Sequence, residues 1–80
     1  MRAIFVQFKC KLGQAYKVAS DVIDHIPEVS EIYSTSGQYD LLGKFYLEDH
    51  VDVGRFVTEQ LQVLDGITDT FTLVTFTAFR

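Results

Sequence analysis

Residues 18–34, VASDVIDHIPEVSEIYS, recur in similar form 38 positions later as residues 56–72, FVTEQLQVLDGITDTFT. In each copy, apolar residues are spaced three and four positions apart and then give way to a short run rich in β-branched and aromatic residues. This change of period predicts a helix followed by a strand. The strand runs VSEIYS and ITDTFT match conservatively at five of six positions, so the sequence carries one helix–strand unit twice.

Two further strands complete the expected order of elements. Apolar residues alternate before the first unit and again between the two units, as expected for strands. Pro27 ends the first helix because proline lacks an amide hydrogen, and Asp49 is the expected N-cap of the second helix. The expected elements are a strand over Arg2–Cys10, a helix over Gln14–Ile26, strands over Val29–Ser36 and Leu41–Leu47, a helix from Glu48-Asp49 to Leu64, and a strand over Ile67–Phe79.

The order strand-helix-strand-strand-helix-strand predicts the α+β class and the ferredoxin-like arrangement. Right-handed crossovers make the four-stranded sheet antiparallel and put both helices on one of its faces. With only 80 residues, we expect a single domain over residues 1–80.

The uncovered face of this sheet predicts association. An 80-residue chain buries only roughly 60% of the surface that it exposes when unfolded. The lone Cys10 cannot form an internal disulfide, and one cysteine with two distant histidines, His25 and His50, gives no metal site. The first, third and fourth predicted strands are apolar on both faces, which is more than a soluble monomer normally exposes. We expect the open face to pack sheet to sheet on a second copy; the alternative is that loops and edge twist cover it.

Charge and hydropathy exclude several classes of partner. The net charge is −4, and the seven lysines and arginines are scattered along the chain, whereas polyanion binding needs clustered cations. Neither nucleic acid nor a membrane surface is therefore an expected partner. No run of 18 apolar residues occurs, as a membrane span would need. Together with the lone thiol, this predicts a reduced, cytoplasmic protein.

The turn Ser36-Gly37-Gln38-Tyr39-Asp40 is the strongest candidate for a binding site. Glycine permits a tight turn whose amide groups point outward, tyrosine offers an aromatic wall, and aspartate offers a carboxylate for an ammonium group. These groups would suit the zwitterion of an amino acid. An ordinary β-hairpin turn is the alternative, since glycine and aspartate are common turn residues. No nucleophile–base pair, phosphate-binding loop or paired-carboxylate motif is present.

Three motifs in order carry a resemblance to a known family. They are Ile26-Pro27-Glu28-Val29, then Ser36-Gly37-Gln38-Tyr39-Asp40-Leu41, then Leu64-Asp65-Gly66-Ile67-x-x-Thr70-x-Thr72. This pattern resembles the effector domain of the Lrp/AsnC transcription regulators, which is called RAM, and it covers essentially all 80 residues. Ser36 in place of threonine and Ile67 in place of valine are mild departures. Family members usually carry a helix-turn-helix domain before this one, so the chain looks like the stand-alone RAM proteins.

The resemblance implies an assembly and a ligand. Family members form dimers by sheet packing, and the dimers often form octameric rings that bind amino-acid effectors between them, without a cofactor. By resemblance, Gly37 and Gln38 would supply backbone contacts, Tyr39 a pocket wall and Asp40 the ammonium partner. Thr70 and Thr72 would come from a neighbouring subunit; their alternative role is simple β-propensity on an edge strand.

The expected function is therefore that of a homo-oligomeric, amino-acid-binding module that is not an enzyme. It would regulate transcription or amino-acid metabolism indirectly, through assembly with full-length Lrp/AsnC regulators. The alternative is a small dimeric enzyme of the cofactor-independent monooxygenase type, which needs a polar cluster between sheet and helices. The predicted helix stripes are apolar except at Gln60, which disfavours an enzyme. An ACT-like amino-acid sensor shares the topology but fits the loop and threonine motifs less well.

We predict that the purified 80-residue chain does not retard duplex DNA at physiological salt. Its net charge of −4 cannot displace counterions from the phosphate backbone. An electrophoretic mobility assay checks this prediction, and sequence-specific retardation by the chain alone would contradict it.

Overall fold

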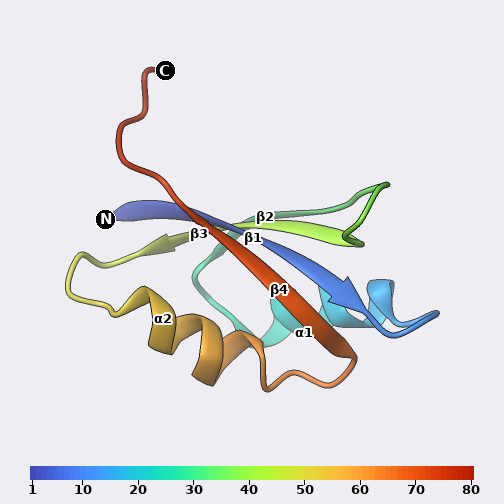
Figure 1. Ribbon diagram of the computed structural model, residues 1–80. Helices are drawn as coiled ribbons and strands as arrows, with labels where there is room; N and C mark the ends of the chain where they lie inside the picture. The colour runs from blue at the N-terminus through green and yellow to red at the C-terminus, as the bar shows by residue number, and fades with distance from the viewer.

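The computed structural model describes residues 1–80 and contains the expected order of elements (Figure 1). The elements are β1 (Arg2–Cys10), α1 (Ala15–His25), β2 (Val29–Ser34), β3 (Leu41–Leu47), α2 (Val53–Phe56), the π-helix η1 (Val57–Leu61) and β4 (Ile67–Val74). The first and third strands have the predicted bounds. The first helix is one residue shorter than predicted at each end, and its C-cap is Ile26, next to Pro27.

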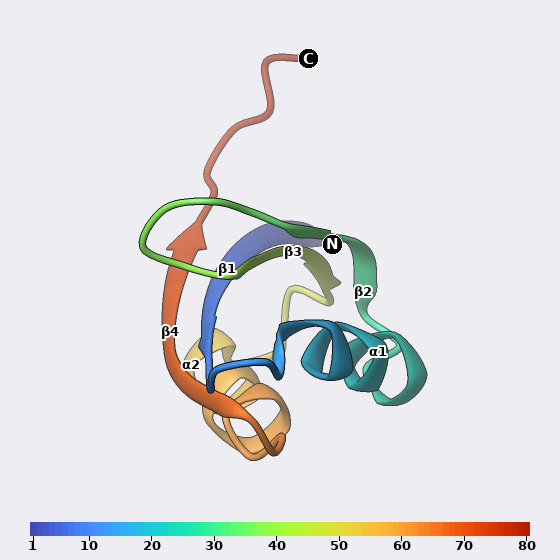
Figure 2. The ribbon, with the colours of Figure 1, turned by 90° about the vertical axis from the view of Figure 1, so that its right-hand side faces the viewer.

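The four strands form one antiparallel sheet in the order β2-β3-β1-β4. Figure 2 shows the sheet curving over the helices, with α1 and α2 on its concave side and nothing on the other. The predicted α+β, ferredoxin-like fold with both helices on one face is therefore confirmed. No helix combines the length and the apolar character that crossing a bilayer would require.

The core lies between the sheet and the helices and is wholly apolar. No polar or charged side chain is buried. The ring of Phe45 lies at its centre, with ring centroids 6.3 Å from Phe8 and 5.7 Å from Phe56, both edge to face. The twelve buried side chains are Ile4, Val6, Phe8, Val18, Val22, Ile26, Leu41, Phe45, Leu47, Phe56, Val57 and Leu61.

The second helix begins at Val53, so the prediction that Asp49 is its N-cap is wrong. Asp52 caps the helix instead, because its Oδ1 accepts a hydrogen bond of 3.0 Å from the amide of Arg55. Asp49 lies one turn earlier, and its carboxylate is 3.3 Å from the amino group of Met1. Asp49 therefore belongs to the connection that precedes the helix and not to its cap.

The same helix ends at Leu61 rather than at the predicted Leu64. Its last turn is a π-helix, in which the amide of Gln62 donates a hydrogen bond of 2.8 Å to the carbonyl of Val57, five residues earlier. This wider turn holds Leu61 on the same side as Phe56 and Val57, and all three are buried.

Two strands are shorter than predicted because their partners run out. β2 ends at Ser34, not Ser36, since Ser34 pairs with the first residue of β3. β4 ends at Val74 rather than Phe79, because its only partner strand, β1, begins at Arg2, and Val74 already pairs with Ile4. Residues 75–80 leave the sheet as an extended tail (Figure 1).

The open face of the sheet carries large apolar side chains, as the alternation predicts. Tyr33 is 55% exposed, Phe71 49% and Leu73 47%. In the middle of this face the Lys44 ammonium lies 3.9 Å from a Glu31 carboxylate oxygen. It also lies over the rings of the neighbouring aromatic residues, 5.8 Å from the centroid of Phe5 and 5.1 Å from that of Tyr46.

Gly43 in β3 provides a test of the core. A Cβ atom at this position would lie 2.8 Å from the Phe45 ring and 3.4 Å from the Phe8 ring. Gly43→Ala should therefore lower the free energy of unfolding by about 1–3 kcal/mol, the usual cost of overpacking. Urea unfolding at a fixed protein concentration measures this change.

Gly54→Ala is the matched control for this substitution. Its new methyl group would lie 3.3 Å from the capping Asp52 Oδ1 but would meet no core side chain, and alanine favours a helix over glycine. Equal stability of Gly43→Ala and the wild type would show that the close packing of the Phe45 ring does not constrain the core.

Candidate functional site

The loop between β2 and β3 is held in a single conformation by its own hydrogen bonds. The Thr35 amide donates a hydrogen bond of 2.9 Å to the carbonyl of Asp40, and the Thr35 hydroxyl donates one of 3.0 Å to the carbonyl of Tyr39. Gly37 has a φ of +107°, a conformation that side chains other than hydrogen rarely allow. Gly37 and Gln38 therefore form an exposed tip with accessible backbone amides.

Asp40 joins this loop to the end of β1. Its amide donates a hydrogen bond of 2.8 Å to the carbonyl of Phe8, and its Oδ2 accepts a hydrogen bond of 2.8 Å from the amide of Cys10. The pairing of β1 with β4 shifts register between Lys9 and Cys10, and the carboxylate satisfies the amide at this irregularity. Burial and, secondly, the negative charge of Asp40 raise the pKa of the Cys10 thiol, which keeps it protonated. Asp40 Oδ1 makes no hydrogen bond within the chain.

Tyr39 and Asp40 are adjacent in sequence but line different hollows. The Tyr39 ring packs on Phe71 of the open face, with centroids 6.1 Å apart and planes tilted by 30°. A shallow hollow of about 360 Å³ lies here, lined by Gln7, Ser36, Gln38, Tyr39 and Phe71. Asp40 instead lines a hollow beside the connection from β1 to α1, which includes Cys10. The loop therefore presents its aromatic wall and its carboxylate in different directions.

Thr70 and Thr72 lie on the helix side of β4. They pair with the buried Phe8 and Val6, respectively, and directly paired residues share a face of the sheet. The Thr70 hydroxyl accepts a hydrogen bond of 2.8 Å from the Gln62 side chain. The sheet thus separates both threonines from the Tyr39 ring, and a single subunit does not bring the six predicted residues together.

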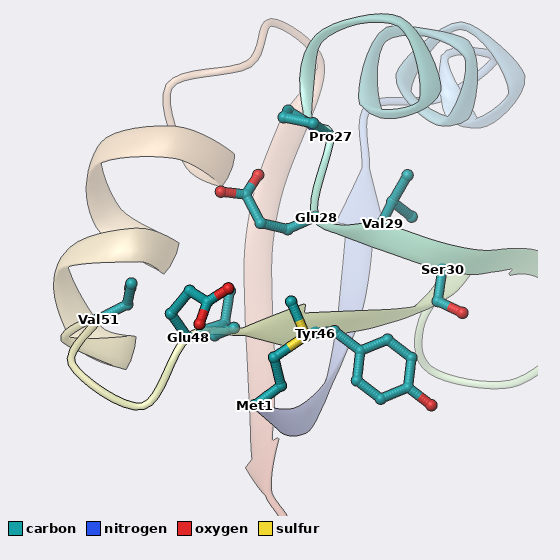
Figure 3. Close-up of a pocket in the computed structure, with 9 residues that line it drawn as sticks. Met1, Pro27, Glu28, Val29, Ser30, Tyr46, Glu48 and Val51 are labelled. Atoms are coloured by element: carbon teal, nitrogen blue, oxygen red, sulfur yellow. The ribbon is translucent and has the colours of Figure 1, made fainter.

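Sequence reasoning missed two features that line hollows. Gln7 and Phe71 complete the hollow at Tyr39, and only the register of β1 against β4, which pairs these two residues, could have revealed them. A larger hollow of about 530 Å³ lies at the far end of β3 (Figure 3). Its lining is mostly apolar, with two carboxylates, and consists of Met1, Pro27, Glu28, Val29, Ser30, Tyr46, Leu47, Glu48 and Val51.

The chain matches a family model described as the Lrp/AsnC ligand binding domain over residues 3–79. It is 27% identical over 77 residues to an uncharacterized HTH-type transcriptional regulator of Pyrococcus furiosus, covering 96% of this chain and 51% of the relative. It is 29% identical over 70 residues to the HTH-type transcriptional regulator FL11 of the same organism, covering 88% of this chain and 45% of FL11. The chain thus spans about half the length of these curated relatives.

Solved structures give the same comparison in three dimensions. TTHA0845 from Thermus thermophilus superposes with a TM-score of 0.89 at 29% identity, covering 100% of this chain and 99% of that chain. FFRP-DM1 superposes with a TM-score of 0.87 at 28% identity, covering 95% and 100%. The transcriptional regulator NMB0573 of Neisseria meningitidis, solved as a complex with L-Met, shares the fold at 18% identity with a TM-score of 0.83, covering 99% of this chain and 52% of that chain.

Fold, motif order and family match agree. The βαββαβ topology holds the loop between β2 and β3 at one end of the open sheet face, and the family model matches from the first strand into the tail. The chain therefore belongs to the Lrp/AsnC family, as a ligand-binding domain of the kind that its regulators carry.

Proposed function

We propose that the chain is an oligomeric, amino-acid-binding module of the cytoplasm that acts on transcription through assembly with Lrp/AsnC regulators. The observation that carries this proposal is the family match over residues 3–79. A related regulator of the same fold forms a complex with L-Met, which supports an amino acid as the effector. The curated relatives are helix-turn-helix transcriptional regulators, which supports a role in transcription.

The loop offers the groups that an amino-acid zwitterion needs. Asp40 Oδ1 makes no hydrogen bond within the chain and can accept one from an ammonium group. The exposed amides at Gly37 and Gln38 can donate to a carboxylate, and Tyr39 supplies an apolar wall. Thr70 and Thr72 would reach this site only from a neighbouring subunit, because the sheet separates them from Tyr39 within one subunit. Asp40 and Tyr39 of one subunit line different hollows, so in this proposal the ligand lies between subunits and takes its carboxylate partner and its aromatic wall from different copies of the loop.

The open sheet face is suited to pack against the same face of a second copy. Its large apolar side chains are about half exposed, and their burial stabilises a dimer by about 25 cal/mol per Å². The charge of Lys44 is matched by Glu31 at 3.9 Å, so a partner that covers this face buries an ion pair rather than a lone charge. Dimers formed in this way would assemble further into rings.

No observation favours the enzyme alternative. Such an enzyme would need a buried polar cluster between sheet and helices, and the side chains buried there are all apolar. Both histidines are exposed, His25 at the end of α1 and His50 before α2.

Asp40→Asn tests the ligand site. Asparagine can still accept the hydrogen bond from the Cys10 amide, but it removes the charge that pairs with an ammonium group. A hydrogen bond to a charged group contributes about 1.5–3 kcal/mol, so amino-acid binding should weaken by roughly 10- to 150-fold. Isothermal titration calorimetry, first with the twenty amino acids and then with the tightest ligand, measures this change.

Asp24→Asn is the matched control, because Asp24 is exposed on α1 and should leave the affinity unchanged. Binding of that ligand to Asp40→Asn with wild-type affinity would mean that the loop is an ordinary turn.

Glu31→Gln tests the assembly. It leaves Lys44 without its carboxylate partner, so covering the face would bury an uncompensated charge. We expect the dissociation constant of the dimer to rise at least about tenfold, or about 1.4 kcal/mol, as measured by sedimentation equilibrium. Glu59→Gln is the control, since it breaks the exposed pair of Glu59 with Arg55 on the helix side. A wild-type chain that stays monomeric at micromolar concentration would refute sheet-to-sheet assembly.

A further inference from the structure

The tail after β4 carries two aromatic side chains that touch almost nothing. Phe76 is 98% exposed and Phe79 is 97% exposed. The segment Thr75-Phe76-Thr77-Ala78-Phe79 contains neither glycine nor proline, and its threonine and phenylalanine residues favour extended strands. Two large aromatic side chains that pack on nothing within the subunit indicate that this segment contacts a surface.

The chain's own sheet cannot supply that surface. β1 is the only strand that pairs with β4, and Ile4 already pairs with Val74, so little of β1 remains beyond this point. The Thr75 hydroxyl donates to the carbonyl of Ala3, which fixes where the tail departs. From there the backbone of residues 76–80 runs on without a partner strand.

The direction of the tail indicates where its partner lies. Figures 1 and 2 show it rising on the side of the sheet opposite to α1 and α2, away from the body of the subunit. This is the side of the open face, and Phe71 and Leu73 of that face lie on the strand that leads into the tail. A molecule that covers the open face would therefore also meet Phe76 and Phe79.

We propose that residues 75–80 form an arm that packs on a second copy of the chain, with Phe76 and Phe79 as its anchors. This inference rests on the proposed sheet-to-sheet dimer and names two further residues that would stabilise it. The free backbone groups of the arm can pair with a strand edge of the second copy, since the outer edges of β2 and β4 have no neighbour.

The size of the arm suits this role. A covered phenylalanine buries about 150–250 Å², so the four phenylalanines of two arms contribute roughly 600–1,000 Å². A standard protein interface buries about 1,600 Å² in total. The arms are therefore a large share of such an interface, in addition to the sheet faces. The arm's one charged side chain is Arg80, so a polyanion is a poor alternative occupant.

Phe76→Ser and Phe79→Ser test the energetic contribution of the arm. Neither side chain belongs to the core, so the subunit should keep its fold, which circular dichroism checks. Each substitution should raise the dissociation constant of the dimer at least about tenfold, as measured by sedimentation equilibrium. Leu12→Ser is the matched control: Leu12 is 100% exposed but lies at the opposite end of β1, and its loss should leave the dimer unchanged.

Photo-crosslinking tests where the arm lies. p-Benzoylphenylalanine replaces Phe79 in the full chain, and the protein is mixed with an isotope-labelled wild-type chain before irradiation. Mass spectrometry should find the probe attached to the labelled chain, on its open face or on the outer edge of β2 or β4. The same probe at position 12 is the control and should give no such product.

The outcomes separate the arm from the dimer itself. A monomeric wild type would overturn both the sheet-to-sheet dimer and the arm. A dimeric wild type whose dissociation constant is unchanged by Phe76→Ser and Phe79→Ser, with crosslinks confined to the subunit's own residues, would overturn the arm alone. Weaker dimers together with crosslinks to the labelled chain would support the arm.

Discussion

The structure depends on the burial of one face of β1. Ile4, Val6 and Phe8 alternate along this strand and are completely buried, and β1 pairs with β3 on one side and with β4 on the other. Both helices cover the face that these side chains form (Figure 2). The strand lies between β3 and β4 in the sheet, so it joins the strand of the second helix–strand unit to the rest of the molecule. A chain of this size has no second core that could compensate for its loss.

The same strand creates the need for a partner. Side chains in a strand point alternately to opposite faces, so an apolar central strand is apolar on both. Two helices are enough to cover one face only, and the other carries the half-buried Phe5 and the exposed Phe71 and Leu73 of β4. Lys44 lies on that face, and its ion pair with Glu31 balances the lysine charge, so this charge does not oppose burial of the face. The fold and the proposed assembly thus follow from a single property, which is apolar sequence on both faces of the sheet in a two-layer structure.

The geometry of the loop separates the two side chains that the proposed ligand site needs. Tyr39 packs against Phe71 on the open face. Asp40 instead points to the end of β1, where its carboxylate accepts a hydrogen bond from the amide of Cys10. Adjacent residues diverge because each is held by a different strand. Within one subunit the carboxylate and the aromatic wall belong to separate hollows. A site assembled from such parts needs surfaces from more than one chain, as the proposed binding between subunits requires.

The sequence by itself determined the identity and order of the elements, because hydrophobic period is a local property of neighbouring residues. The bounds of β1 and β3 and the Ser36–Asp40 turn could be read in this way. Tertiary structure decided the rest. Asp52 rather than Asp49 caps the second helix, because the helix begins at Val53 and Asp52 is the residue that can accept from the Arg55 amide. β4 does not reach Phe79, although its alternation continues, because β1 has only two residues beyond Ile4, the partner of Val74. The placement of the threonines on the helix side, away from Tyr39, depended on strand register, which links residues more than sixty positions apart and leaves no local trace in the sequence.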